Sequence, residues 1–251
     1  MQMNPYLTFK EECAREIEAQ GGDETLRQAS RDWMNLANRA RYSYHFEWLG
    51  RPVIQYPQDL VAMQELMWRI KPDLVIETGV AHGGSLVFFA SMLELNAVCG
   101  GPADATVLGI DIEIRAHNRS FIEAHPLARR IRLIQGSSTN ATVVAEARRA
   151  TQDRRKVMVS LDSNHTHDHV LAELQAYAPL VSAGSYCMVF DTVIEHMPRD
   201  MFPDRAWGPG NNPMTAVKAF LERHAEFEID QEMDAKLLIS VAPGGFLRRR
   251  V

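Results

Sequence analysis

Two aspartates and three histidines fall within eight residues in the stretch LDSNHTHDHV, residues 161–170, directly after an apolar run. Carboxylates and imidazoles at this spacing can bind a divalent metal or move a proton, and the same residue types also begin helices. The choice among these roles depends on the elements that position the side chains.

Two carboxylates, Asp162 and Asp191, each follow an apolar run that reads as a buried strand. Neighbouring strands lie about 4.8 Å apart, and two ionised carboxylates at that spacing repel each other. A divalent cation between them removes the repulsion, and Mg²⁺ prefers such oxygen ligands. Alternatively, one carboxyl group carries a proton or pairs with a nearby lysine or arginine. We expect both aspartates to be metal ligands and part of the catalytic centre.

His165 lies three residues after Asp162, in the loop before the next predicted helix. An imidazole ordinarily has a pKa of about 6.5, so it can accept the proton of a hydroxyl near neutral pH, and we expect His165 to be the general base. The glutamate of the H-E-x-x-H motif is absent between His165 and His169, which argues against zinc hydrolysis. These two histidines and Asp162 could mimic an iron site. Otherwise His167 and His169 are expected to be exposed on the first helical turn or near the substrate.

Three further strand ends carry, in order, glycines, an acid and small polar residues. The run VIETGVAHGGS (75–85) permits a tight turn with close approach to a ligand, Asp111 can accept hydrogen bonds from a ribose, and the run QGSS ends the third strand. The glycine spacing is neither the dinucleotide fingerprint nor a P-loop. Each element alone could equally serve packing or helix capping. Together they have the layout of a class I S-adenosylmethionine pocket. The residues assigned to this cofactor are Glu77, Gly79, Gly83, Ser85, Asp111, Gly136, Ser137 and Ser138.

Short apolar, β-rich runs alternate with helical runs from residue 73 onward. This pattern predicts an α/β fold with a doubly wound, mostly parallel, seven-stranded sheet of the Rossmann-like methyltransferase class. The last two runs, 227–230 and 244–250, have no long helix between them, so we expect an antiparallel edge. Ligands of such sheets gather at the carboxyl ends of the strands.

The first 56 residues read as a helical extension and residues 57–251 as the methyltransferase domain. Amphipathic helices are predicted over 6–20 and 23–42, with a loop over 46–57. The extra helices suggest a lid or a subunit contact, and we expect a homo-oligomer.

Composition limits the other partners. The chain has 251 residues, 46% hydrophobic residues and a net charge of −5, which is typical of a globular protein and argues against nucleic acid as the main partner. Three widely spaced cysteines do not suggest disulfides, which fits a cytoplasmic protein. The N-terminus has no apolar leader, and no apolar run approaches the ~20 residues of a membrane helix.

Several stretches resemble the cephalosporin hydroxylase family, whose members are similar to Mg²⁺-dependent class I methyltransferases and include rhamnosyl O-methyltransferases. The resemblance covers about residues 42–251 and rests on the runs HFEWLGRPVIQYPQD, IETGVAHGGSL, GIDIEIRAHNR, LDSNHTHDHVLAEL, YAPLVSAGSY, FDT and WGPGNNPMTAV.

The resemblance implies S-adenosylmethionine-dependent, Mg²⁺-assisted methylation of a sugar hydroxyl, with a dTDP-activated rhamnose-type deoxysugar of natural-product biosynthesis as the acceptor. It matches Asp162 and Asp191 to metal ligands and His165 to the base. Relatives carry Glu-Asp where this chain has Phe190-Asp191, so one expected ligand is missing. The residues expected to contact the acceptor are Tyr56, His167, Trp207, Asn211 and Asn212, although a loop that only caps the next helix remains the alternative for the last three.

Two other functions fit parts of the pattern. A NAD-dependent oxidoreductase would use a related sheet, although the glycine spacing argues against it. A non-catalytic nucleotide-sugar binding protein would have the same ligand pocket at the strand ends but would not transfer a methyl group.

Overall fold

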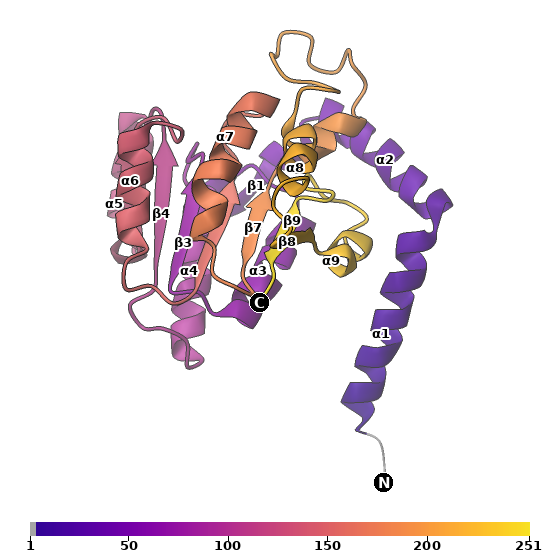
Figure 1. Cartoon of the computed structure of the whole chain (residues 1–251), viewed down its shortest axis with the longest axis horizontal. Helices are drawn as coiled ribbons and strands as arrows, with labels where there is room; N and C mark the ends of the chain where they lie inside the picture. The colour runs from indigo at the N-terminus through magenta and orange to yellow at the C-terminus, as the bar shows by residue number, and fades with distance from the viewer. Residues whose placement is uncertain (1–3) are drawn as a thin grey trace.

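A seven-stranded sheet forms the centre of the computed structural model, which describes residues 4–251 (Figure 1). Its order is β5-β4-β3-β6-β7-β9-β8; the first five strands are parallel, and β9 runs antiparallel to both β7 and β8. The predicted seven-stranded, mostly parallel sheet with an antiparallel edge is therefore confirmed. The strands are β3 Leu74–Thr78, β4 Thr106–Asp111, β5 Ile131–Gln135, β6 Val157–Leu161, β7 Tyr186–Val189, β8 Phe227–Ile229 and β9 Phe246–Arg249.

Helices cover both faces of the sheet, so the central strands β3, β6 and β7 are buried along their whole length and are mostly apolar. One apolar core joins the sheet to α3 (Pro57–Ile70), α4 (Gly84–Val98) and α5 (Ala116–Ala124). The other joins it to α6 (Ala141–Ala150), α7 (His167–Tyr177) and α8 (Pro213–Leu221). The four 3₁₀ turns are η1 Tyr42–His45, η2 Ala128–Arg130, η3 Ala178–Leu180 and η4 Thr192–His196.

The strand register brings the polar strand ends to one edge. Thr78, the last residue of β3, pairs with Ile110 of β4 and with Leu161 of β6. The residues that follow these strands are therefore neighbours at the carboxyl edge of the sheet, at the top of Figure 1. The long loop 197–212, between η4 and α8, lies at the same end (Figure 1).

The N-terminal segment contains α1 (Pro5–Gly22), α2 (Glu24–Arg39) and an antiparallel hairpin of β1 (Phe46–Trp48) and β2 (Arg51–Val53). The hairpin corrects the loop predicted over 46–57. Two short helices, α5 and α9 (Gln231–Lys236), lie in segments where no helix was predicted. The projecting α1 has no buried residue and meets the rest of the chain near α9, where the Gln20 amide donates to the carbonyl of Ala235 at 2.9 Å (Figure 1).

Across residues 4–251, none of the helices combines the length and the apolar character needed to cross a bilayer. The three cysteines, Cys13, Cys99 and Cys187, are all free thiols.

Candidate active site

The glycine turn after β3 lies directly against the end of β6. Gly79 has a φ of +92°, and a Cβ there would lie 2.0 Å from the carbonyl oxygen of Asp162. The Asp162 amide donates to the carbonyl oxygen of Thr78 at 2.9 Å, which fixes the two strand ends together. Only glycine allows this close backbone approach, so the turn and Asp162 form one wall of the site.

Asp111 lies beside the same turn, as predicted from its position at the end of β4. Its Oδ2 accepts hydrogen bonds from the backbone N–H groups of Val80 at 2.8 Å and Ala81 at 3.3 Å. Gly83, with a φ of +81°, is the N-cap of α4 and completes the turn. The carboxylate therefore holds the glycine turn in place as well as standing where a ribose is expected.

Glu77 is buried on β3, where the hydroxyl of Ser85 donates to its Oε2 at 2.9 Å. Burial raises the pKa of Glu77 to about 8, although the Ser85 hydrogen bond opposes the shift, and the nearby charge of Asp111 adds to it. The Glu77 carboxyl group is therefore mostly protonated at neutral pH in the protein alone.

The turn after β5 adjoins Asp111, because the amide of Gly136 donates to the Asp111 carbonyl at 2.8 Å. Ser137 lies in this turn, with its hydroxyl 3.1 Å from that of Thr139. Ser138 is buried and connects to α7, with its hydroxyl 3.1 Å from His169 Nε2.

His169 does not have either of the roles expected for it. Its Nε2 contacts the hydroxyls of Ser138 and, at 3.2 Å, Ser163, and it lies 3.5 Å from the buried carboxylate of Glu173. The side chain thus connects the ends of β5 and β6 to α7. This placement also removes the basis for an iron site made of Asp162, His165 and His169.

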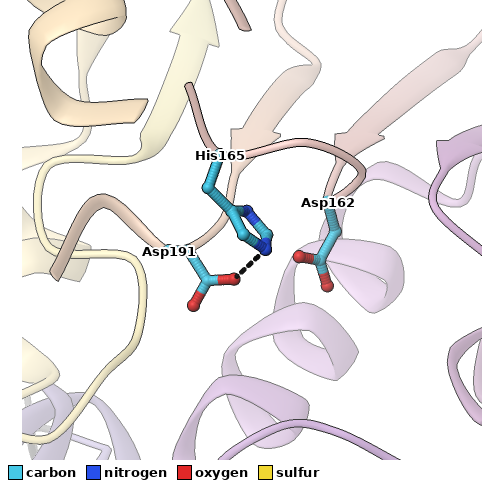
Figure 2. Close-up of side chains that lie close together, drawn as sticks. All are labelled: Asp162, His165 and Asp191. Atoms are coloured by element: carbon cyan, nitrogen blue, oxygen red, sulfur yellow. Dashed lines mark ion pairs between the residues drawn. The ribbon is translucent and has the colours of Figure 1, made fainter. Parts of the chain in front are cut away.

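Three side chains converge at the carboxyl ends of β6 and β7 (Figure 2). Asp162, His165 and Asp191 each offer one ligand atom, and these atoms all lie within 4.8 Å of one another. His165 Nε2 is 3.3 Å from Asp191 Oδ2. Asp191 has a φ of +56°, a left-handed conformation that aspartate tolerates better than most residues and that begins η4. The predicted approach of the two acids is therefore present, and the imidazole lies beside them.

The acids repel each other in the way the metal hypothesis requires. Desolvation raises the pKa of Asp162 well above its usual range, and the negative charge of Asp191 raises it further. A cation bound among these groups would stabilise both carboxylates in the ionised form. Two carboxylates and an imidazole are also a donor set that divalent metals accept, so the residues present fit a metal ion.

Glu195 does not replace the carboxylate that the family resemblance led us to expect at position 190. Its Oε2 accepts hydrogen bonds from the backbone N–H of Gly210 at 2.8 Å and from the side-chain amide of Asn212. Burial raises the pKa of Glu195, but these hydrogen bonds together with the nearby Lys218 and His196 lower it more, so the net shift is downward. The carboxylate is ionised and holds the loop 197–212.

Gln55 lies beside the acids, although no pattern in the sequence singled it out. Its Nε2 donates to Asp162 Oδ2 at 3.0 Å, while its Oε1 is buried without a hydrogen-bond partner among the described residues. A lone glutamine between a hairpin and a helix matches no motif. The adjacent Tyr56, which was expected to contact the acceptor, is fully buried, and its hydroxyl donates to Asn38 Oδ1 at 2.7 Å.

A cavity of about 400 Å³ connects the glycine turn, the three converging side chains and the loop 197–212. Its wall includes Trp207, whose ring centroid lies 5.6 Å from that of His165. The cavity is lined by Asn38, Arg41, Ser43, Tyr44, Pro52, Ile54, Gln55, Gly79, Val80, Ala81, His82, Gly84, Ser85, Asp162, His165, Asp191, Ile194, Met197, Phe202, Arg205, Trp207 and Val241.

The other residues expected to contact the acceptor are not in this lining. His167 donates its backbone N–H to Asn211 Oδ1 at 2.9 Å, and its Nδ1 lies 2.8 Å from the hydroxyl of Thr215. Asn212 is fully buried and forms a capping box with Thr215 at the start of α8. The helix-capping alternative therefore describes Asn212, whereas Asn211 joins the loop to the first residue of α7 and His167 contacts α8. Of the residues expected to contact the acceptor, only Trp207 borders the cavity.

The sequence matches a known protein family and is similar to characterised relatives over most of its length. Residues 40–250 match the family described as Rhamnosyl O-methyltransferase/CmcI. Rhamnosyl O-methyltransferase of Mycobacterium bovis is 31% identical over 196 residues, covering 76% of this chain and 73% of the relative. The enzyme of that name from Mycobacterium leprae is 31% identical over 207 residues, covering 81% of this chain and 82% of the relative.

Solved structures agree on the fold. An apo structure of CmcI superposes with a TM-score of 0.56 at 20% identity, covering 83% of this chain and 77% of CmcI. A CmcI structure with Mg and SAM gives a TM-score of 0.54 at 19% identity, covering 83% of this chain and 78% of that one. The predicted methyltransferase fold and the family resemblance are both confirmed.

Proposed function

The chain belongs to the Rhamnosyl O-methyltransferase/CmcI family, and we propose that it transfers a methyl group from S-adenosylmethionine to a hydroxyl of a dTDP-activated, rhamnose-type deoxysugar in natural-product biosynthesis. The observation that carries the proposal is the single cavity that joins the glycine turn at Gly79 to Asp162, His165 and Asp191. A donor bound on the turn and an acceptor bound among the three side chains would meet in this cavity.

The cofactor residues are proposed from their places on the strand ends. Gly79 and Ser85 line the cavity, and Asp111, Gly136, Ser137 and Ser138 continue along the same edge of the sheet toward β5. In this arrangement the methionine end of the cofactor lies beside Ser85 and Glu77, and the adenosine end lies beside Asp111.

Asp162 and Asp191 would hold Mg²⁺, which when bound orients the acceptor oxygens and lowers the pKa of the reacting hydroxyl. His165 accepts the hydroxyl proton as the oxygen attacks the methyl carbon and the carbon–sulfur bond breaks. Gln55 holds one oxygen of Asp162, and Trp207 closes the cavity beside the imidazole. Alignment of donor and acceptor in this space supplies a large part of the rate enhancement, since proximity alone can contribute about 7–11 kcal/mol in well-oriented systems.

The test is transfer of labelled methyl from S-adenosylmethionine to a panel of dTDP-sugars in the presence of Mg²⁺. We expect a rhamnose-type dTDP-sugar to become labelled, and EDTA to stop the reaction. Full turnover in metal-free buffer would reject the metal role, and no labelled sugar in the panel would reject the acceptor.

The His165→Ala variant tests the base. We expect turnover to fall about 10²–10⁴-fold, with unchanged affinity for S-adenosylhomocysteine and for Mn²⁺. Because His165 also lies within ligand distance of the acids, loss of Mn²⁺ affinity would identify it as a metal ligand instead. Unchanged turnover would exclude both roles.

We also propose that the enzyme is a cytoplasmic homo-oligomer. The first turns of α1 expose Tyr6, Leu7 and Phe9, each more than half accessible, on a helix with no buried residue. Because α1 packs mainly on α9 and α2, burial of these apolar side chains against a second copy would stabilise it further. Light scattering of the full chain and of a Leu7→Ser, Phe9→Ser variant would measure the difference in mass.

A further inference from the structure

Two arginines from separate segments line the cavity at a distance in sequence from the acids. Arg41 follows α2, and Arg205 lies in the loop 197–212. The two segments are neighbours, because Arg39 and Asp200 form an ion pair of 3.8 Å. Two guanidinium groups therefore border the same space as Asp162 and Asp191.

Neither guanidinium is neutralised by the rest of the described chain. Across residues 4–251, Arg41 and Arg205 form no ion pair, and their side chains donate no hydrogen bond. By contrast, the guanidinium of Arg51 in the nearby hairpin donates to the backbone carbonyl of His82 at 2.9 Å. The donors of Arg41 and Arg205 remain free.

Aromatic rings support both groups without occupying those donors. The Arg41 guanidinium lies 4.4 Å from the ring centroid of Tyr44, and that of Arg205 lies 5.8 Å from the ring centroid of Trp207. Trp207 is itself packed against Phe202, with ring centroids 5.4 Å apart. An arginine stacked on an aromatic face keeps its N–H groups available around its edge.

The chemistry of the free donors selects the ligand. A guanidinium binds phosphate oxygens with paired, charge-assisted hydrogen bonds, and it gains little from a neutral hydroxyl by comparison. The chain has a net charge of −5, so it does not attract anions as a whole, and the attraction must be local to these side chains. Two such groups beside one cavity match the two phosphates of a diphosphate.

We propose that Arg41 and Arg205 bind the diphosphate of the acceptor, so that the enzyme selects a nucleoside-diphosphate sugar over a neutral glycoside. The assignment rests on the proposed function and names the residues that recognise the activated form of the sugar. The other anion expected near the cavity is the carboxylate of S-adenosylmethionine. The test below distinguishes arginines that bind this carboxylate from arginines that bind the diphosphate.

The test compares dTDP-rhamnose with methyl rhamnoside as acceptors for the wild type, Arg41→Gln and Arg205→Gln. We expect each variant to raise the KM for dTDP-rhamnose on the order of tenfold, because each loses charge-assisted hydrogen bonds to a phosphate. The kcat, the KM for methyl rhamnoside and the Kd for S-adenosylhomocysteine should stay within about twofold of the wild type. Arg132→Gln, an exposed arginine on β5 outside the cavity, is the matched control.

Calorimetry with dTDP alone keeps the test independent of turnover. Weaker dTDP binding by both variants supports the proposal even if no sugar is methylated. The absence of methylation would refute the proposed function and not this inference. The inference is overturned if the wild type does not bind dTDP, or if the variants bind dTDP as tightly as the wild type. It is also overturned if Arg41→Gln and Arg205→Gln lower the affinity for S-adenosylhomocysteine and not that for dTDP.

Discussion

Replacing Gly79 by alanine tests whether the glycine turn and the two acids proposed to bind the metal form one rigid unit. In the structure the new Cβ would lie 2.0 Å from the Asp162 carbonyl oxygen and 2.6 Å from its carbonyl carbon. Both atoms belong to the backbone, so no side-chain rotation can relieve the contact. The φ of +92° adds backbone strain, because an L side chain rarely adopts that conformation.

The size of the effect follows from the overlap. Real Cβ atoms essentially never approach another atom closer than 3.0 Å, so the turn and Asp162 must separate by about 1 Å, the difference between 3.0 and 2.0 Å. A displacement of about 1 Å in a reacting centre can reduce turnover about 10²-fold. The left-handed backbone should cost a further 1–2 kcal/mol or so of folding stability.

The assay measures methyl transfer, Mn²⁺ affinity and thermal unfolding for Gly79→Ala beside Gly100→Ala. Gly100 has a φ of +80°, but a Cβ there meets nothing within 4 Å, so this control carries the strain without the contact. We expect both variants to lose stability, and only Gly79→Ala to lose turnover and metal affinity. Equal turnover in the two variants would refute the close coupling between the turn and Asp162.

Three further predictions concern the same edge of the sheet. Gln55→Leu removes the donor to Asp162, so Mn²⁺ affinity measured by calorimetry should fall about 10–100-fold while S-adenosylhomocysteine binding persists. Asp191→Asn removes a charge that raises the pKa of Asp162, so the metal-free variant should melt no lower than the wild type, yet added Mn²⁺ should no longer raise its Tm. Asp59 is buried on α3, where it accepts hydrogen bonds from the Ser240 hydroxyl at 2.6 Å and from the Val241 backbone N–H at 2.9 Å. Burial outweighs these hydrogen bonds and raises the pKa of Asp59 from 3.8 to about 7, so the stability that the protonated group contributes is full below pH 3.8 and is lost as the pH rises through about 7. The shift of about three units corresponds to at most about 4 kcal/mol, and urea unfolding between pH 5 and 8 should show a shallower loss for Asp59→Asn; identical pH profiles would contradict this assignment.

The sheet could be predicted because its signal is local. Buried parallel strands are short apolar runs, and their polar ends stand out, so the positions of Gly79, Asp111, Asp162 and Asp191 followed from the sequence and the rule that ligands gather at the carboxyl edge. The hairpin 46–53 was missed because each strand has three residues and one contains Pro52. Such short strands give too few alternations to be distinguished from a loop.

The acceptor side could not be predicted because its residues compete for two roles. Asparagine can meet a sugar hydroxyl, but it can equally satisfy backbone groups, and Asn211 and Asn212 do the latter. Gln55 and Arg41 carry no motif and enter the cavity only through the packing of the N-terminal segment. Contacts of this kind depend on tertiary structure, which the periodicity of one sequence does not contain.

The charge balance of the site connects Phe190, where the family resemblance led us to expect a glutamate, to the proposed acceptor. Phe190 is buried against Phe246, with ring centroids 6.3 Å apart, so this position adds no charge to the cavity. Two ionised aspartates and one divalent cation sum to zero, whereas a third carboxylate would leave a net negative centre. A neutral centre does not repel an anionic acceptor, and the attraction of its diphosphate is then left to Arg41 and Arg205. If that balance governs acceptor choice, Phe190→Glu should raise the KM for dTDP-rhamnose more than that for methyl rhamnoside, and an equal change for the two acceptors would count against it.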